Sequence, residues 1–170
     1  MIEPAAAHTV SIEAEINGRR VRAAVPTHRT LLDFLREDLA LTAAKRACDV
    51  QVCGACTVLV DGLPVSACTF LAFEINGRTV ETCEGLAREG VLHPIQQAFV
   101  DAGALQCGYC TPGMIMITKA LLADHPRPSV EEIKAYLHGN ICRCTGYKKI
   151  LDAVLAAAEA AGDQKEGAVS

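Results

Sequence analysis

The sequence predicts an α+β protein, with a strand-rich N-terminal half followed by a helical C-terminal half. Apolar and polar residues alternate over residues 10–25 around Asn17-Gly18, a pattern typical of a β-hairpin. From about residue 91 the apolar residues recur at helical spacing instead. The chain has 170 residues, of which 51% are hydrophobic, so it can bury a core in one domain or in two small ones.

The N-terminal half is expected to form a sheet with one helix on it. Leucine and phenylalanine residues at helical spacing predict a helix over residues 30–41, packed on the hairpin. Residues 57–68 predict a second pair of short strands around an Asp-Gly turn, and residues 78–83 predict one more strand. The domains are expected at residues 1–83 and 84–170.

The C-terminal half carries clear helix signals. Thr111 is expected to cap a helix with Pro112 in its first turn. Ser129 and Glu132 form a capping box, and Gly139 stands where the C-cap of that helix belongs. Four helices predict a small bundle. They are expected at residues 93–104, 112–125, 130–138 and 148–162.

Charge and hydropathy exclude several classes of partner. The net charge is -4 and the charged residues are interspersed, so no basic stripe is present to bind nucleic acid. We expect no membrane insertion, because no run of about 18 apolar residues occurs. The first 15 residues lack the features of a signal peptide, which predicts a soluble cytoplasmic protein. A periplasmic location is expected only if a partner that carries the signal exports it.

The nine cysteines are the main chemical feature of the chain. Their odd number, in a reducing compartment, argues against a disulfide scaffold. Without Cys83, to which we assign no role, they form one set of four in each half. Two such sets indicate two metal centres. The sets are Cys48, Cys53, Cys56 and Cys68, and Cys107, Cys110, Cys142 and Cys144.

The spacing of the first set is typical of a particular cluster. Four residues separate Cys48 from Cys53 and two separate Cys53 from Cys56, with Cys68 further on. This is the spacing of plant-type ferredoxins, which bind a 2Fe-2S cluster. The second set has no ferredoxin spacing, but its four thiolates suit soft iron or zinc.

Other readings of the cysteines are weaker. A zinc-stapled interaction module is the main non-redox alternative, although Cys48-x4-Cys53 and Cys142-x-Cys144 depart from the usual zinc spacings. A thioredoxin-like dithiol would leave most of the thiols unused. No histidine follows a Cys-x-x-Cys pair to attach haem, and the five histidines lie away from the cysteine loops, which argues against a Rieske centre.

Three motifs together resemble one family. The segments "CGACTVLVDG", "QCGYCTPGM" and "GNICRCTGY" are similar to those of the small iron-sulfur subunit of the xanthine oxidase family of molybdenum hydroxylases. The resemblance extends over about residues 9–158. It implies a β-grasp, ferredoxin-like domain followed by a four-helix bundle, each with one 2Fe-2S cluster.

The resemblance also implies the site residues and the partners. The outer cluster would be bound by Cys48, Cys53, Cys56 and Cys68, and the inner cluster by Cys107, Cys110, Cys142 and Cys144. Gln106 and Cys144 match positions that contact the molybdopterin, in its cytosine dinucleotide form, of a large subunit. Electrons would pass one at a time from molybdenum through both clusters to a medium FAD subunit or a cytochrome. We expect no substrate site in this chain, and the alternative function is a free-standing ferredoxin-like carrier.

One loop departs from the family pattern. Many members have glycine just before the first cysteine and three residues after it, where this chain has Ala47 and Gln51. Glycine at such places often serves a positive φ, which glutamine adopts reluctantly. The substitutions leave all four ligands in place and affect the geometry of the loop.

Overall fold

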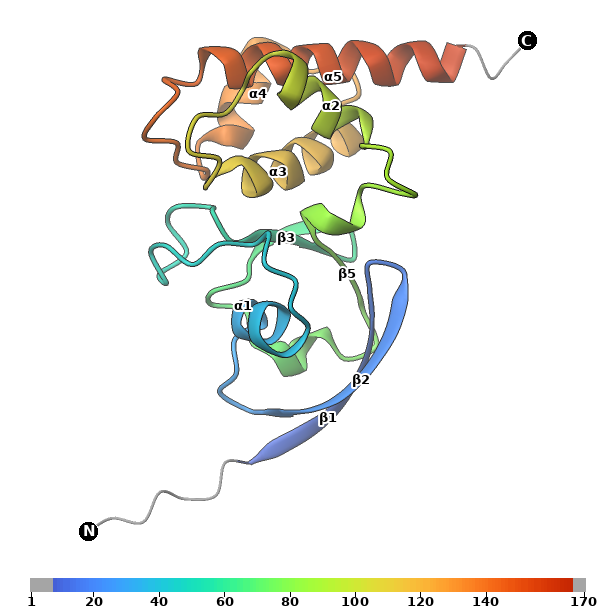
Figure 1. Cartoon of the computed structure of the whole chain (residues 1–170), viewed down its shortest axis with the longest axis vertical. Helices are drawn as coiled ribbons and strands as arrows, with labels where there is room; N and C mark the ends of the chain where they lie inside the picture. The colour runs from blue at the N-terminus through green and yellow to red at the C-terminus, as the bar shows by residue number, and fades with distance from the viewer. Residues whose placement is uncertain (1–7, 167–170) are drawn as a thin grey trace.

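The computed structural model describes residues 8–166, in which a sheet half lies against a helical half (Figure 1). Within these residues a mixed sheet has the strand order β2-β1-β5-β3-β4, with β1 and β5 parallel and the other neighbours antiparallel. The architecture is α+β, as the sequence predicts. The strands are β1 (Thr9–Ile16), β2 (Arg19–Pro26), β3 (Thr57–Val60), β4 (Leu63–Ser66) and β5 (Thr79–Glu81). The helices are α1 (Leu31–Asp33), α2 (Pro94–Asp101), α3 (Thr111–Asp124), α4 (Val130–Leu137) and α5 (Lys148–Glu166).

Both predicted hairpins are present, and their turns use left-handed backbone. Asn17 and Gly18 have φ of 51° and 77°, and Asp61 and Gly62 have φ of 50° and 80°. Two successive positive φ values make a turn whose twist matches that of the strands. These turns set the register of β1 with β2 and of β3 with β4.

The helix of the sheet half is shorter than the predicted span of residues 30–41. Thr30 caps α1, which continues as a π-helical turn, η1 (Phe34–Asp38). Ala40 then takes a left-handed φ of 56°, which ends the helical path. Leu31, Leu32, Phe34 and Leu35 are fully buried against the sheet, as the pattern predicts, whereas Leu39 and Leu41 are only partly buried.

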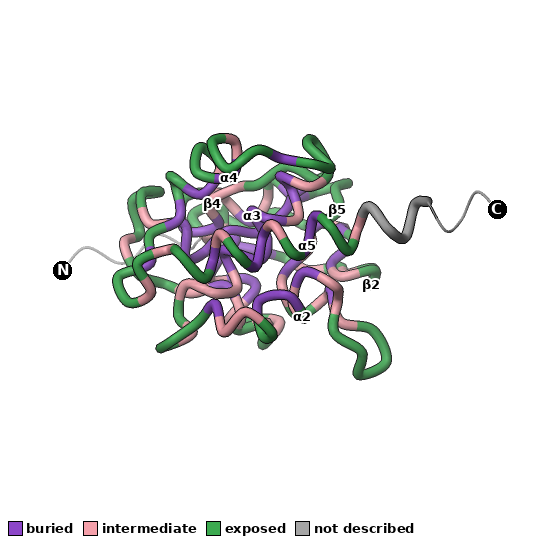
Figure 2. The backbone as a smooth tube through the Cα atoms, turned by 90° about the horizontal axis from the view of Figure 1, so that it is seen from above, coloured by how far each residue is buried: buried purple, intermediate pink, exposed green. Residues whose placement is uncertain are grey.

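Strand β3 is shared by two hydrophobic cores. All four of its residues are buried: Val58 and Val60 belong to the core under α1, whereas Leu59 belongs to the core of the helical half. Alternate residues of a strand face opposite sides of a sheet, so β3 joins the two halves directly. Figure 2 shows the buried backbone gathered in the middle of the molecule.

The helical half contains the four predicted helices, and two of their caps differ from expectation. Thr111 lies inside α3, whose N-cap is Cys110, so the prediction that Thr111 caps this helix is wrong. The capping box of Ser129 and Glu132 at α4 is confirmed. The C-cap of α4 is His138 rather than Gly139, and Gly139 has no left-handed φ.

The two ends of the chain, which the expected domains include, are not described by the structure. They are residues 1–7 and 167–170. Between residues 8 and 166, none of the helices combines the length and apolar character that crossing a bilayer requires.

Candidate iron-sulfur centres

The first cysteine loop joins η1 to β3 and is tightly curled. Asp49, Gln51 and Gly54 have φ of 56°, 59° and 69°, so the chain turns left-handed three times between Cys48 and Cys56. The turns direct backbone N–H groups inward. Cys48 Sγ accepts hydrogen bonds from the N–H groups of Val52 and Cys53, each at 3.4 Å.

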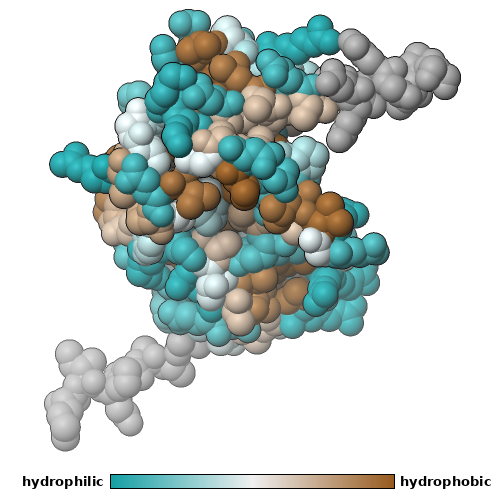
Figure 3. Space-filling model, turned by 45° about the horizontal axis from the view of Figure 1, so that its top comes forward, coloured by the Kyte–Doolittle hydropathy of each residue, from teal (hydrophilic) through white to brown (hydrophobic). Residues whose placement is uncertain are grey.

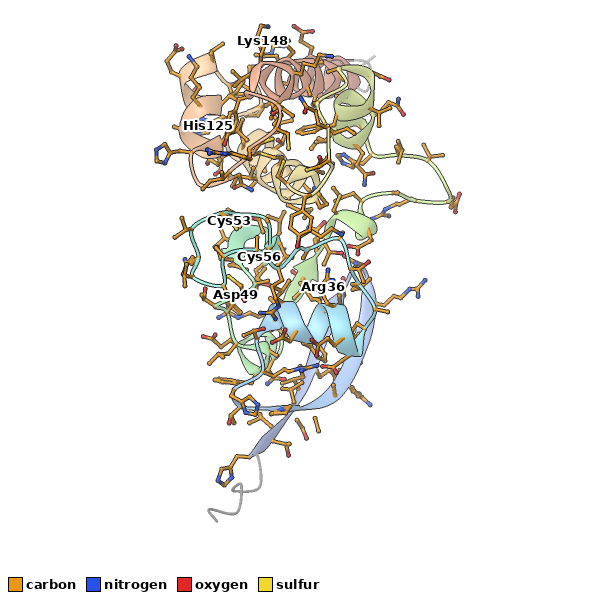
Figure 4. The ribbon with its side chains drawn as sticks, turned by 60° about the vertical axis from the view of Figure 1, so that its left-hand side comes forward. Arg36, Asp49, Cys53, Cys56, His125 and Lys148 are labelled. Carbon is orange, nitrogen blue, oxygen red and sulfur yellow. The ribbon has the colours of Figure 1, made fainter. Side chains whose placement is uncertain are left out.

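The four cysteines of the first set come together in two pairs. The side chain of Cys48 contacts that of Cys53, and the side chain of Cys56 contacts that of Cys68, which follows β4. The Cys56–Cys68 pair is buried. Figure 4 places Cys53 and Cys56 where this loop faces the helical half.

The environment of the first set gives Cys48 and Cys56 different acidities. Backbone hydrogen bonds from Val50, Val52 and Cys53 lower the pKa of Cys48 to about 6, so this thiol ionises at neutral pH. Burial raises the pKa of Cys56 to about 12. A buried thiol of this kind becomes a thiolate when a metal ion supplies the compensating charge.

The second set is assembled from two loops of the helical half. Cys107 and Cys110 precede α3, and Cys142 and Cys144 lie between α4 and α5. Cys144 Sγ lies 3.5 Å from Cys107 Sγ, and the side chain of Cys110 contacts that of Cys142. The sequence-distant loops therefore form one site, again with two pairs of sulfurs.

The two pairs of the second set also differ in environment. Cys107 and Cys144 are exposed, whereas Cys142 is buried and Cys110 is half-buried. Burial raises the pKa of Cys110 to about 12. Burial, the largest single cause, acts in the same direction at Cys142, but hydrogen bonds from Thr145, Cys144 and Cys110 together outweigh it and lower the pKa of that thiol.

This donor set fits a cluster of two metal ions. Within residues 8–166, no group of three or more His, Cys, Asp or Glu side chains is arranged as ligands of one metal ion. A 2Fe-2S cluster uses four thiolates, two on each iron, and each cysteine set here offers two pairs. The hydroxyl of Thr111, next to Cys110, is buried without a hydrogen-bond partner, and a sulfide-containing cluster would bring an acceptor to this region.

The two cysteine loops are hydrogen-bonded to each other. The N–H of Ile141 donates to the carbonyl oxygen of Cys53 at 2.9 Å, and Asn140 Nδ2 donates to the carbonyl oxygen of Gly54 at 3.0 Å. Tyr109, between Cys107 and Cys110, donates its hydroxyl to the carbonyl oxygen of Arg46. The two sites are thus held at a fixed separation.

The remaining predicted residues fall at clear positions. Gln106 is exposed beside Cys107 and so lies near Cys144, on the same edge of the helical half. Cys83 lies in the connection between the halves, away from both sets, and Gln96 Nε2 donates to its carbonyl oxygen at 3.0 Å. Gln51 adopts the positive φ that a glycine would serve, whereas Ala47 does not.

The hydrogen bonds of three polar residues around the sites were not predicted from the sequence, although Tyr147 was expected to pack against the loops. Asn140 bridges the loops, and Thr145 and Tyr147 make hydrogen bonds around Cys142. The signal for Thr145 is its place three residues after Cys142, the separation at which a side chain reaches back to a loop residue.

Exposed apolar side chains surround the cysteine loops. Hydrophobic surface lies across the middle of the face in Figure 3, among other patches. Apolar surface at such loops suits contact with another protein. The large apolar residues exposed in and beside the loops are Val50, Val52, Leu105, Tyr109 and Ile141.

Comparison with known proteins assigns each half of the chain to a family of 2Fe-2S-binding domains. Residues 14–87 match the family described as 2Fe-2S iron-sulfur cluster binding domain, and residues 82–155 match the 2Fe-2S binding domain family. The chain is 47% identical over 155 residues to the nicotine 6-hydroxylase small subunit of Paenarthrobacter nicotinovorans, covering 91% of this chain and 93% of that protein.

Further relatives agree with this assignment. The xanthine dehydrogenase iron-sulfur-binding subunit of Escherichia coli O157:H7 is 45% identical, with 86% of this chain and 93% of that protein covered. The crystal structure of quinoline 2-oxidoreductase from Pseudomonas putida 86 contains a chain that is 43% identical, with a TM-score of 0.87 over 91% of this chain and 97% of that one. The chain therefore belongs to the family of small iron-sulfur subunits, with two 2Fe-2S domains, of the xanthine-oxidase-type molybdenum hydroxylases.

Proposed function

We propose that this chain is the electron-transfer subunit of a molybdenum-containing hydroxylase or dehydrogenase complex. The observation that carries the proposal is the pairing of eight cysteine sulfurs into two four-thiol sites whose loops are hydrogen-bonded through Ile141 and Cys53. A 2Fe-2S cluster, when bound, accepts and releases one electron at a time. Two such sites in series suit the relay of an electron pair that must leave a molybdenum centre in single steps.

The residues of each site have distinct tasks in this function. The outer cluster is assigned to Cys48, Cys53, Cys56 and Cys68, and the inner cluster to Cys107, Cys110, Cys142 and Cys144. Burial of Cys56 and Cys142 keeps water from part of each site, and the curled loop before Cys53 directs backbone N–H groups at Cys48 Sγ. Such hydrogen bonds favour the more negative, reduced state of a thiolate-bound cluster.

The partner assignments follow from the exposed edge of the helical half. We assign Gln106 and Cys144 to contact with the molybdopterin, in its cytosine dinucleotide form, of a large subunit, because both are exposed at the site of the inner cluster. The exposed Val50 and Val52 then suit the subunit that receives the electrons, either an FAD subunit or a cytochrome. The free-standing carrier is not favoured, because the relatives named above are subunits.

The finer architecture is part of the same proposal. We assign a β-grasp domain to residues 1–83 and a four-helix bundle to residues 84–170, supported by the strand order of the sheet and by the contacts among α2, α3, α4 and α5. We place the complex in the cytoplasm, where a reducing environment keeps the thiols available to bind the clusters.

Metal analysis of the purified complex tests the proposal. We expect about four irons and about four acid-labile sulfides per chain, no stoichiometric zinc, and two distinct electron paramagnetic resonance signals on reduction. The chain should elute from size-exclusion chromatography with a large molybdenum-containing subunit. Only two irons per chain, or one zinc, would contradict the two-cluster assignment.

A further inference from the structure

The loop that carries Cys142 continues into Thr145, which donates two hydrogen bonds to one sulfur. Thr145 Oγ1 lies 3.0 Å from Cys142 Sγ, and the backbone N–H of Thr145 donates to the same sulfur at 3.4 Å. Cys142 is buried, with 8% of its surface exposed. The sulfur therefore has these protein donors in place of water.

The direction of the threonine hydroxyl is fixed by its neighbour. Thr145 Oγ1 accepts the backbone N–H of Tyr147 at 3.2 Å, so the hydroxyl hydrogen is free to point at Cys142 Sγ. The Tyr147 hydroxyl accepts the N–H of Cys142 at 2.8 Å and donates to the carbonyl oxygen of Asn140 at 3.1 Å. Cys142, Thr145 and Tyr147 thus form a closed ring of hydrogen bonds.

The outer site has no equivalent arrangement at either of its threonines. Thr57 directly follows Cys56, but its hydroxyl donates to the carbonyl oxygen of Gly54 at 2.8 Å. Thr69 directly follows Cys68, but its hydroxyl lies 3.1 Å from Gln51 Oε1 and 3.3 Å from the carbonyl oxygen of Ser66. The hydrogen bonds that reach Cys48 Sγ from Val52 and Cys53 come from backbone N–H groups. A side-chain change at Thr145 can therefore act on the inner site selectively.

We propose that Thr145 is a positioning residue that acts through Cys142 and raises the reduction potential of the inner cluster by hydroxyl donation to its sulfur. The inference rests on the proposed function, because it requires Cys142 to be a cluster ligand. Reduction adds one electron and one negative charge to a cluster. A hydrogen bond to a ligand sulfur stabilises the charged, reduced form more than the oxidised form.

Thr145→Val in the assembled complex tests this directly. Valine keeps the branched shape and the backbone N–H but removes the hydroxyl, whereas Thr145→Ser is the matched control that keeps it. In a redox titration followed by electron paramagnetic resonance, we expect the reduction constant of the inner cluster to fall about tenfold in Thr145→Val, a shift of about 59 mV for one electron. The Ser variant should stay near wild type, and the outer cluster serves as an internal reference in every sample.

The outcomes separate this inference from the function on which it rests. If both signals are present but the inner potential of Thr145→Val equals that of wild type, the role of Thr145 is wrong and the two-cluster assignment stands. Absence of an inner signal from wild type would instead contradict the function. If Thr145→Val loses the inner cluster, the titration is repeated with Thr145→Ala. If Thr145→Val and Thr145→Ala both lose the inner cluster while Thr145→Ser keeps it, the hydroxyl is needed to retain the cluster, and the assignment to its potential is overturned. Loss of the inner cluster from Thr145→Ser as well would also overturn the inference.

Discussion

The backbone N–H of Ile141 lies 2.9 Å from the carbonyl oxygen of Cys53, and this hydrogen bond joins the loops of the two sites. The amide of Asn140 adds a second bond to Gly54, across a sequence separation of 86 residues. Both acceptors are main-chain atoms of the first loop. A change in the backbone of that loop is therefore expected to affect both sites.

Gly54→Ala tests this coupling. Gly54 has φ of +69°, and an added Cβ would lie 2.5 Å from both Asn140 Cγ and the carbonyl oxygen of Gly139. We expect loss of the outer cluster and altered spectra of the inner cluster, measured by iron content and electron paramagnetic resonance.

Gly62→Ala is the matched control for Gly54→Ala. It has a similar φ of +80°, but nothing lies within 4 Å of the added Cβ. It should lose only about 1–2 kcal/mol of stability through the left-handed backbone and keep both clusters. Equal effects of the two substitutions would show that backbone strain, and not the contact between loops, is responsible.

The sequence predicts the fold well where the signals are local. The Asn-Gly and Asp-Gly turns, the capping box at Ser129 and the helix that follows Pro112 all depend on residues a few positions apart. The cap predicted at Thr111 was wrong because Cys110 already has helical backbone, with φ of -81° and ψ of -17°, so that Thr111 is the first residue of α3. Cysteine spacing predicts which thiols belong together but not their pairing, which depends on how separate loops meet.

Gln51 stands where many family members have glycine, and a contact with a residue distant in the sequence accompanies this substitution. It adopts φ of +59°, and its side chain meets the hydroxyl of Thr69 at 3.1 Å, so it links the first cysteine loop to the segment after Cys68. The positive φ could be predicted from the glycine that many family members have there. The bond to Thr69 could not, because it spans 18 residues.

Comparing Gln51→Gly with Gln51→Ala separates the cost of the left-handed backbone from the effect of losing the hydrogen bond to Thr69. Both substitutions remove the hydrogen bond to Thr69. Only glycine adopts the positive φ without steric cost, and this difference is worth about 1 kcal/mol of folding free energy. We expect Gln51→Ala to have a lower melting temperature and a faster loss of outer-cluster absorbance than Gln51→Gly. If Gln51→Ala is as stable as Gln51→Gly, the positive φ stores no strain.

Cys83→Ser should leave both clusters intact. Burial raises the pKa of Cys83, so it remains a neutral thiol, and Gln96 Nε2 lies 3.7 Å from its sulfur. A serine hydroxyl can accept the same donor, so we expect unchanged iron content and a stability change within about 1 kcal/mol. Cys68→Ser is the contrasting variant and should abolish the outer signal. Loss of either signal in Cys83→Ser would mean that the ligands are wrongly assigned.

His93 is expected to make the stability of the helical half depend on pH. Its Nδ1 accepts the N–H of Ile95 at 3.2 Å and so caps α2. Burial, with the charge of Lys119, lowers the pKa of His93 below 6.5. As the pH falls, the unfolded chain binds the proton first, so the stability from the neutral cap is complete above pH 6.5 and is lost as the pH falls through the folded pKa.

His93→Asn retains a capping acceptor that does not titrate. Its melting temperature should equal that of wild type at about pH 7.5 and exceed it at about pH 5.5, because only the wild-type cap is lost on protonation. Parallel curves for the two proteins across this range would contradict a role for the imidazole. Because both proteins contain the same cysteines, any effect of acid on the clusters cancels in the comparison.

Cys110→Ala tests the order of electron flow. Cys110 belongs to the inner set, which lies beside the exposed Gln106, whereas the outer set lies in the sheet half. Electrons that enter at the inner edge must cross this set before they reach Cys53, so its disruption should leave the outer cluster oxidised during turnover while substrate still reduces molybdenum.

Assembly of the Cys110→Ala complex must be verified first, because a bound cluster also stabilises the loops that hold it. Gln106→Ala keeps all eight ligands, and we expect it to slow the reduction of both clusters without changing iron content. Rapid-freeze spectra then decide the order. If the outer cluster of Cys110→Ala is reduced at the wild-type rate, electrons reach it without the inner site. The hydrogen-bonded loops of Cys53 and Ile141 would then fix the geometry of the subunit without carrying the electrons.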